Sequence, residues 1–79
     1  MDIESLKFFI EVRNSANITN TANAFYVTQS AVSKRLSMLE AELGVQLFQR
    51  GKGRSRAVIT PAGESFAEIA ERILLLHPE

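Results

Sequence analysis

Residues 28–44, TQSAVSKRLSMLEAELG, decide the fold of this 79-residue chain. Four aliphatic side chains in this stretch recur at i, i+4, i+7 and i+11, which is the spacing of one side of a helix. They are Val32, Leu36, Leu39 and Leu43. Thr28 is suited to the N-cap of such a helix and Gly44 to a left-handed C-cap. The stretch therefore predicts a helix over residues 29–42 with one buried side.

The opposite side of this helix carries short or amide-bearing polar groups. They are Gln29, Ser30, Ser33, Lys34 and Ser37. Small residues allow close approach to the major groove, and amide, hydroxyl and cationic groups match base edges and phosphates. The alternative is an ordinary exposed side, which more often carries long Glu and Lys side chains in i,i+4 pairs. The pattern favours a DNA recognition helix.

Two shorter helices are predicted ahead of this one. Asp2 is suited to cap a helix over residues 3–13. After a polar turn, Asn17 or Thr19 is suited to cap a second helix over about residues 19–25. A tight break separates this second helix from the third. Two helices joined by so short a turn, the later one polar in its N-terminal half, predict a helix-turn-helix.

Beyond Gly44, two apolar runs flank a stretch rich in glycine and cations. The runs are residues 45–48 and 57–60, and the sequence between them is QRGKGRSR. Apolar runs around glycines predict a β-hairpin. Its cations are Arg50, Lys52, Arg54 and Arg56. Beside a recognition helix, such a hairpin is typical of a wing that contacts phosphates or the minor groove, the alternative being a plain surface turn.

A last helix is predicted from Pro61 to about Leu76, with Thr60 as its N-cap. Apolar side chains surround more of this helix than one small domain covers. Those assigned to dimerisation are Phe66, Ile69, Ile73, Leu74 and Leu75. Aliphatic surface left in water costs about 25 cal/mol per Å², so a covering partner is expected. The sequence favours a homodimer through antiparallel copies of this helix; the alternative is coverage by a further domain of a longer chain.

The net charge of zero hides an uneven distribution of charge. Residues 28–60 carry a net charge of +4, between residues 1–27 with −1 and residues 61–79 with −3. A basic middle that coincides with the predicted recognition helix and wing favours contact with nucleic acid. A winged helix that binds protein is the rival hypothesis, and the basic wing and the polar helix side count against it.

The side-chain groupings that catalysis or metal binding needs are missing from the sequence. It has no cysteine, and its one histidine, His77, stands beside a proline near the chain end. No carboxylate pair, metal-ligand cluster or nucleophile–base arrangement is visible. The longest apolar run, residues 73–76, is far shorter than the ~20 residues of a membrane span. The expectation is a cytoplasmic binding domain, not an enzyme, without metal or cofactor and away from the membrane.

Several spaced motifs of the chain resemble the LysR family of bacterial transcriptional regulators. They are TQSAVSKRL at residues 28–36 with LE at 39–40, LGVQLFQR at 43–50 and ITPAG at 59–63. The match covers almost the whole chain, and the motifs agree in register. The resemblance implies a mainly α, winged helix-turn-helix fold with a three-helix core, a two-stranded β wing and a long C-terminal linker helix.

The resemblance also implies how functions are divided along the chain. Residues 1–60 are expected to form the DNA-binding domain, with the helix-turn-helix at about 18–37 and the wing at about 47–60. Residues 61–79 are expected to form a linker and dimerisation helix. An effector-binding domain, to which a small molecule binds, is expected C-terminal to this segment.

The expected partner is double-stranded DNA containing a pseudo-palindromic operator, bound by a homodimer or, at full length, by a tetramer. The recognition helix, about residues 28–42, is expected in the major groove, and wing residues 50–56 on the backbone or minor groove. Base and nearby backbone contacts are assigned to Gln29, Ser30, Ser33 and Lys34. Phosphate contacts are assigned to Thr28 and Arg35.

Overall fold

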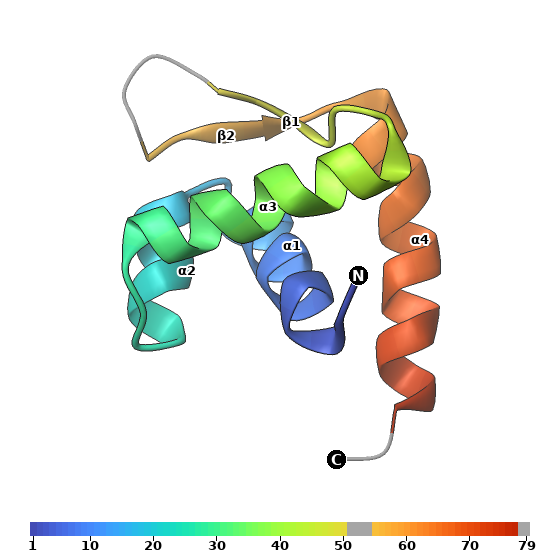
Figure 1. The fold of residues 1–79 in the computed structure, drawn as a ribbon, viewed down its shortest axis with the longest axis horizontal. Coiled ribbons are helices and arrows are strands. Elements are labelled where there is room, and N and C mark those ends of the chain that lie inside the picture. The colour runs from blue at the N-terminus through green and yellow to red at the C-terminus, as the bar shows by residue number, and fades with distance from the viewer. Residues whose placement is uncertain (51–54, 78–79) are drawn as a thin grey trace.

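The computed structural model describes residues 1–50 and 55–77 and places four helices and one two-stranded antiparallel sheet in them (Figure 1). The elements are α1 (Ile3–Ser15), α2 (Ile18–Ala24), α3 (Gln29–Leu43), β1 (Phe48–Arg50), β2 (Ala57–Ile59) and α4 (Pro61–Leu76). The order and type of these elements are those that the sequence predicts, and their ends differ from the predicted ones by a few residues at most.

Each helix begins after a polar residue whose side chain accepts a hydrogen bond from the backbone N–H three residues further on. The four N-caps are Asp2, Asn17, Thr28 and Thr60, with N···O distances of 2.9–3.0 Å. Such caps satisfy backbone donors that have no partner within the helix. The sequence predicts three of the caps outright, and of the two candidates for α2 the structure selects Asn17.

Helix α1 runs through the middle of the fold, with α2 on one side and α4 on the other (Figure 1). Its two adjacent phenylalanines are buried and face different neighbours. The Phe8 ring meets Phe25, at the end of α2, edge-on with ring centroids 4.9 Å apart. The Phe9 ring lies 5.5 Å from the Phe48 ring of β1 and 5.3 Å from the Phe66 ring of α4. Helix α1 therefore joins the helix-turn-helix to the wing and to the last helix.

The apolar stripe of α3 is buried, as the sequence predicts, and packs against α1 and α2. Val32, Leu36 and Leu39 are buried, and Leu43 is partly buried against the same core. Helix α3 ends at Gly44, whose φ of 73° is the left-handed C-cap conformation.

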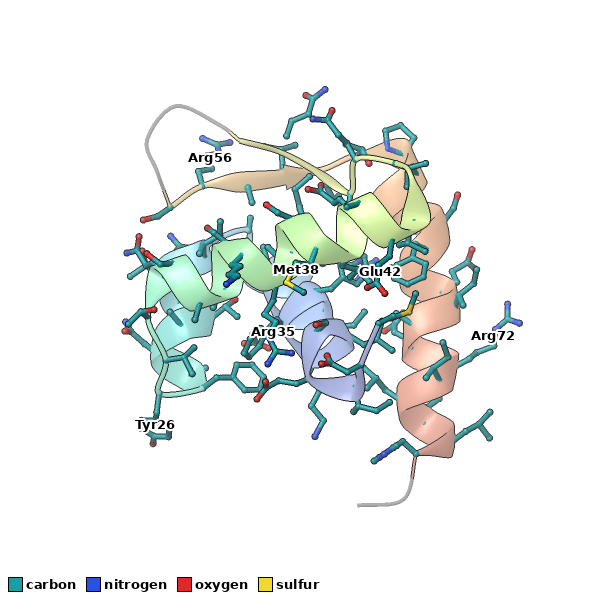
Figure 2. All side chains as sticks on the ribbon, viewed as in Figure 1. Tyr26, Arg35, Met38, Glu42, Arg56 and Arg72 are labelled. Atoms are coloured by element: carbon teal, nitrogen blue, oxygen red, sulfur yellow. The ribbon has the colours of Figure 1, made fainter. Side chains whose placement is uncertain are left out.

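Among the described residues, two that are not glycine also adopt left-handed backbone conformations, one at each end of α2. Ala16 has a φ of 56° and ends α1, and Tyr26 has a φ of 57° in the turn between α2 and α3. The Tyr26 side chain is 96% exposed, and Figure 2 shows it directed away from the helices. These two turns orient α2 and α3 relative to α1.

The hairpin of β1 and β2 has one face toward the core and one toward solvent. Its register pairs Phe48 with Ile59, Gln49 with Val58 and Arg50 with Ala57. Phe48 and Ala57 are buried, whereas Gln49 and Val58 are exposed. This alternation follows from the period of two in a strand.

Helix α4 begins directly after β2 and lies against the base of the hairpin. The backbone N–H of Thr60 donates to the Leu47 carbonyl oxygen at 2.9 Å. Gly63, in the first turn of α4, approaches so closely that a Cβ atom there would lie 2.4 Å from the Leu47 carbonyl oxygen and 2.6 Å from Ile59 Cγ1. Only a residue without a side chain fits this position.

The buried side of α4 is formed by its small residues, Gly63, Ala67 and Ala70. The larger side chains divide into two groups. Phe66, Ile73 and Leu74 are partly buried against the core, whereas Ile69, Leu75 and Leu76 are exposed. None of the helices in the described part of the chain is long and apolar enough to cross a membrane.

The contact at Gly63 predicts a difference between two glycine substitutions. We expect Gly63→Ala to lower the free energy of unfolding by about 1–3 kcal/mol, because the new methyl group overlaps a backbone carbonyl that cannot rotate away. This loss should appear although alanine is the better helix former. Gly44→Ala meets no atom within 4 Å, so its cost is limited to the left-handed backbone, about 1 kcal/mol. Urea unfolding of both variants measures the difference, and a Gly63→Ala variant as stable as the parent would contradict the close contact.

Candidate nucleic-acid interface

Helix α3 presents three sides because successive residues are about 100° apart. One side is apolar and forms part of the core. A second side carries Gln29, Ser33 and Glu40, of which the first is exposed and the other two are half-buried. The side opposite the core carries the exposed residues Ser30, Lys34 and Ser37. The four residues assigned to base contacts therefore share one continuous surface at the N-terminal half of α3.

A chain of hydrogen bonds links Gln29 to the wing through α2. Gln29 Nε2 donates to Thr19 Oγ1 at 2.5 Å, and Thr19 Oγ1 lies 2.5 Å from Ser55 Oγ. Thr19 and Ser55 are half-buried. Three segments that are distant in the sequence therefore meet at one hydroxyl group.

Backbone hydrogen bonds attach the start of β2 to the turn between α1 and α2. The Ile18 N–H donates to the Ser55 carbonyl oxygen at 2.6 Å, and the Ala57 N–H donates to the Ala16 carbonyl oxygen at 3.2 Å. Asn17 and Arg56 lie between them as an isolated antiparallel bridge. This end of the wing is thus held directly to the helix-turn-helix.

The other end of the wing is attached to α3 by one carboxylate. Glu40 Oε2 accepts hydrogen bonds from the backbone N–H of Leu47 at 2.7 Å and of Phe48 at 3.2 Å. Hydrogen bonds from two N–H groups to one charged oxygen are stronger than neutral ones. Glu40 therefore holds the first strand of the wing at a fixed place along α3.

Of the predicted wing cations, Arg56 is the one whose side chain the structure describes. It is exposed, and Figure 2 shows it on the side of β2 that faces away from α3. Lys52 and Arg54 lie outside the described residues, as does the side chain of Arg50.

The two residues assigned to phosphate contacts already have partners within the chain. Thr28 Oγ1 accepts from the Ala31 N–H at 3.0 Å as the cap of α3. The Arg35 guanidinium extends from α3 toward α1 (Figure 2), where it pairs with Asp2 at 2.7 Å and Glu4 at 2.9 Å. Sequence position alone did not indicate this ion-pair cluster.

Asp2 is the residue of that cluster whose pKa is shifted. Hydrogen bonds from the hydroxyl and the backbone N–H of Ser5 lower the pKa of Asp2 from 3.8 to about 2, and the positive charge of Arg35 adds to the shift. The carboxylate therefore caps α1 and neutralises Arg35 in the same ionisation state.

Sequence reasoning missed two residues of this surface, Thr19 and Ser55. The sequence indicates Thr19 only as an alternative cap of the second helix and Ser55 only as part of the glycine-rich stretch. A polar residue early in the first helix of a helix-turn-helix is the one available signal, and it does not identify a partner 36 residues away.

The residues assigned to dimerisation do not all lie together on α4. Phe66, Ile69 and Ile73 share one flank of the helix with Leu76, because they are spaced by three or four residues. We call these four residues the α4 flank. Leu74 falls on the side that carries the buried Ala67 and Ala70, and Leu75 falls on the side that carries Glu68 and Glu71. The exposed fractions of Ile69 and Leu76 are 50% and 84%.

Across the described ranges, 1–50 and 55–77, no group of three or more His, Cys, Asp or Glu residues is placed to hold a metal ion. What the structure brings together is a polar helix surface and a hairpin held at both ends to the helix-turn-helix. A helix-turn-helix with such a hairpin beside its second helix is a winged helix-turn-helix domain.

The chain belongs to the LysR family of bacterial regulatory helix-turn-helix proteins. The model of that family matches residues 3–64. The resemblance of the spaced motifs to this family is thereby confirmed, and so is the expectation of a regulatory domain.

Individual relatives agree with this assignment. The HTH-type transcriptional regulator HdfR of Yersinia pestis (strain Pestoides F) is 45% identical over 74 residues, which are 94% of this chain and 25% of that protein. A crystal structure of a CbnR_DBD–DNA complex is 38% identical and has a TM-score of 0.89, covering 96% of this chain and 85% of that one. A BenM_DBD complex with benA site 1 DNA is 31% identical with a TM-score of 0.84, covering 95% and 82%.

These solved structures confirm the predicted winged helix-turn-helix fold. The chain spans about a quarter of the length of the curated relatives it matches.

The shifted pKa of Asp2 predicts a pH dependence of stability. Because the pKa is about 2 in the folded chain and 3.8 without the fold, the ionised carboxylate stabilises the fold above roughly pH 4, and this contribution is lost as the pH falls toward 2. Asp2→Asn keeps a capping oxygen but removes the charge. We expect a lower Tm near neutral pH and a shallower fall of Tm between pH 4 and 2 than in the parent.

Thermal unfolding followed by circular dichroism at a series of pH values measures this dependence. Glu68→Gln is the matched control, because it removes an equal charge from an exposed position of α4. Parallel Tm profiles for Asp2→Asn and the parent would contradict a stabilising role of the Asp2 charge.

Proposed function

We propose that this chain is the DNA-binding domain of a LysR-family transcriptional regulator and binds a particular sequence in double-stranded DNA. The observation that carries the proposal is the surface at the N-terminal half of α3. It exposes amide, hydroxyl and ammonium groups, and residues 29–39 contain no acidic side chain. Short polar side chains let a helix approach base edges, and the absence of carboxylates there avoids repulsion by phosphates.

In this proposal α3 lies in the major groove. Base and nearby backbone contacts come from Gln29, Ser30, Ser33 and Lys34. Thr28 can donate its hydroxyl hydrogen to a phosphate while its oxygen still caps α3. Arg35 has five N–H groups and an exposed ion pair, so a phosphate can replace one of its two carboxylate partners, Asp2 or Glu4.

The wing adds affinity with little sequence preference. Arg56 is exposed on the outer side of β2, and Arg50, Lys52 and Arg54 precede it in the sequence. Cations carried on a hairpin beside the recognition helix reach the DNA backbone or the minor groove. The hairpin is attached at both ends to the helix-turn-helix, which keeps β1 and β2 beside it.

We further propose a homodimer formed through the α4 flank. Its large apolar side chains are exposed or half-buried in the single chain, and pairing two copies would remove them from water. A two-fold pair also sets two recognition helices against two half-sites of a pseudo-palindrome. Residues 1–60 are the proposed DNA-binding unit and residues 61–79 the linker and dimerisation helix.

The full-length protein is proposed to carry an effector-binding domain after this segment, to bind a small molecule there and to work in the cytoplasm. Selection of bound duplexes from random DNA tests the central proposal. Enrichment of one motif supports it, whereas a winged helix that binds protein would enrich no motif.

Removing the Gln29 amide should weaken discrimination at one base pair. We expect Gln29→Ala to cost about 1–3 kcal/mol on the preferred site, because a side-chain amide can bind a base edge through two hydrogen bonds. Fluorescence anisotropy on the selected site and on its single-base variants measures the loss. Gln46→Ala, which removes an exposed amide from the loop after α3, is the matched control. Equal losses on the preferred site and on random DNA would contradict base recognition by Gln29.

A charge placed on the α4 flank should weaken self-association. We expect Ile69→Glu to raise the dimer dissociation constant at least about tenfold, because burying an unpaired carboxylate in an apolar contact costs more than 1.4 kcal/mol. Leu75→Glu introduces the same charge at a more exposed position off the flank, so its effect should be smaller. Sedimentation velocity at rising concentration measures both constants. A larger effect of Leu75→Glu would place the interface on the other side of α4.

A further inference from the structure

The side chain of Gln29 is exposed but has a defined direction. Exposed glutamine side chains ordinarily sample many rotamers, because three torsion angles separate the amide from the backbone. Here Nε2 lies 2.5 Å from Thr19 Oγ1, across the turn of the helix-turn-helix. This hydrogen bond joins the first turn of α3 to the first turn of α2 and restricts the amide to one region beside α3.

The Thr19 hydroxyl that binds Gln29 has a second hydrogen-bond partner. Thr19 Oγ1 lies 2.5 Å from Ser55 Oγ. Ser55 is fixed in turn, because its carbonyl oxygen accepts the Ile18 N–H at 2.6 Å. The backbone of α2 and the segment just before β2 therefore form a frame around the two hydroxyl groups.

The Gln29 amide has hydrogen-bonding groups that the contact with Thr19 does not use. Nε2 has two N–H groups, and one of them serves Thr19. The second N–H and Oε1 remain, and within the described part of the chain neither has a hydrogen-bond partner. One donor and one acceptor side by side match the N7 acceptor and N6 donor of adenine. The frame thus fixes which edge of the amide faces a ligand.

We propose that Thr19 and Ser55 are positioning residues that orient the Gln29 amide for recognition of one base, adenine by its hydrogen-bonding pattern. They act through Gln29 and contribute to sequence discrimination, not to general affinity. This inference rests on the proposed function, in which Gln29 contacts a base edge. It also makes the start of β2 a determinant of which base α3 selects.

The test uses variants that remove one hydroxyl group each. Thr19→Val keeps the shape and β-branching of the side chain, Thr19→Ser restores the hydroxyl, and Ser55→Ala removes the outer member of the frame. Affinities are measured on the selected duplex, on its single-base variants and on random DNA, alongside Gln29→Ala. For Thr19→Val, the loss of one hydrogen bond predicts about a three- to tenfold lower discrimination at the base pair that Gln29 contacts. Thr19→Ser should restore the parent value, and Ser55→Ala should give a smaller loss at the same base pair.

Two further readouts separate positioning from a structural or phosphate-binding role. The salt dependence of binding should be unchanged in Thr19→Val, and adding Thr19→Val to Gln29→Ala should cause no further loss of discrimination. A uniform loss on all duplexes, or unchanged discrimination in Thr19→Val while Gln29→Ala loses it, would overturn the positioning role and leave the proposed function standing. If Gln29→Ala itself discriminates as the parent does, base recognition by Gln29 fails and the positioning role fails with it.

Discussion

Burial of the Phe9 ring is the constraint on which the placement of the other elements depends. The ring is fully buried, and it touches aromatic rings of β1 and α4, so one side chain of α1 sets the positions of two elements at once. A chain of 79 residues has a small core, and few side chains in it are as large. The neighbouring Phe8 makes the equivalent contact with α2. With α1 fixed in this way, α3 packs across it and exposes its polar N-terminal half.

The wing is integrated into this arrangement at both of its ends. Glu40 holds the start of β1 to α3, and the backbone of Ile18 and the hydroxyl of Thr19 hold Ser55, just before β2. Both attachments use residues of the helix-turn-helix. The spacing between the recognition helix and the hairpin is therefore set by residues of α2 and α3, and a change in either attachment alters how the two surfaces meet DNA together.

The features that sequence reasoning predicted are those with local causes. Helix caps, the stripe of α3 and the glycine C-cap depend on residues within one or two turns, and for this reason Asp2, Thr28, Thr60 and Gly44 were assigned correctly. The ion pairs of Arg35 and the contact of Thr19 with Ser55 join residues more than 30 positions apart, and no spacing rule connects them. The periodicity of α4 predicted a helix but not its orientation, because apolar residues occupy more than one side. The small residues Ala67 and Ala70 face the core, whereas the larger side chains of Ile69, Leu75 and Leu76 are exposed.

The acidic side of α4 has a consequence for how the molecule moves before it binds. Glu64, Glu68 and Glu71 are exposed on α4, whereas residues 28–60 carry a net charge of +4, so a chain of zero net charge has its charges unevenly distributed, as in an electric dipole. In the field of a polyanion a dipole experiences a torque even when it experiences little net attraction. The molecule should therefore rotate as it approaches DNA, with the wing leading and α4 trailing, and a larger fraction of encounters begins in a productive orientation. Added salt shortens the range of that torque, so orientation during approach is gradually lost as ionic strength rises.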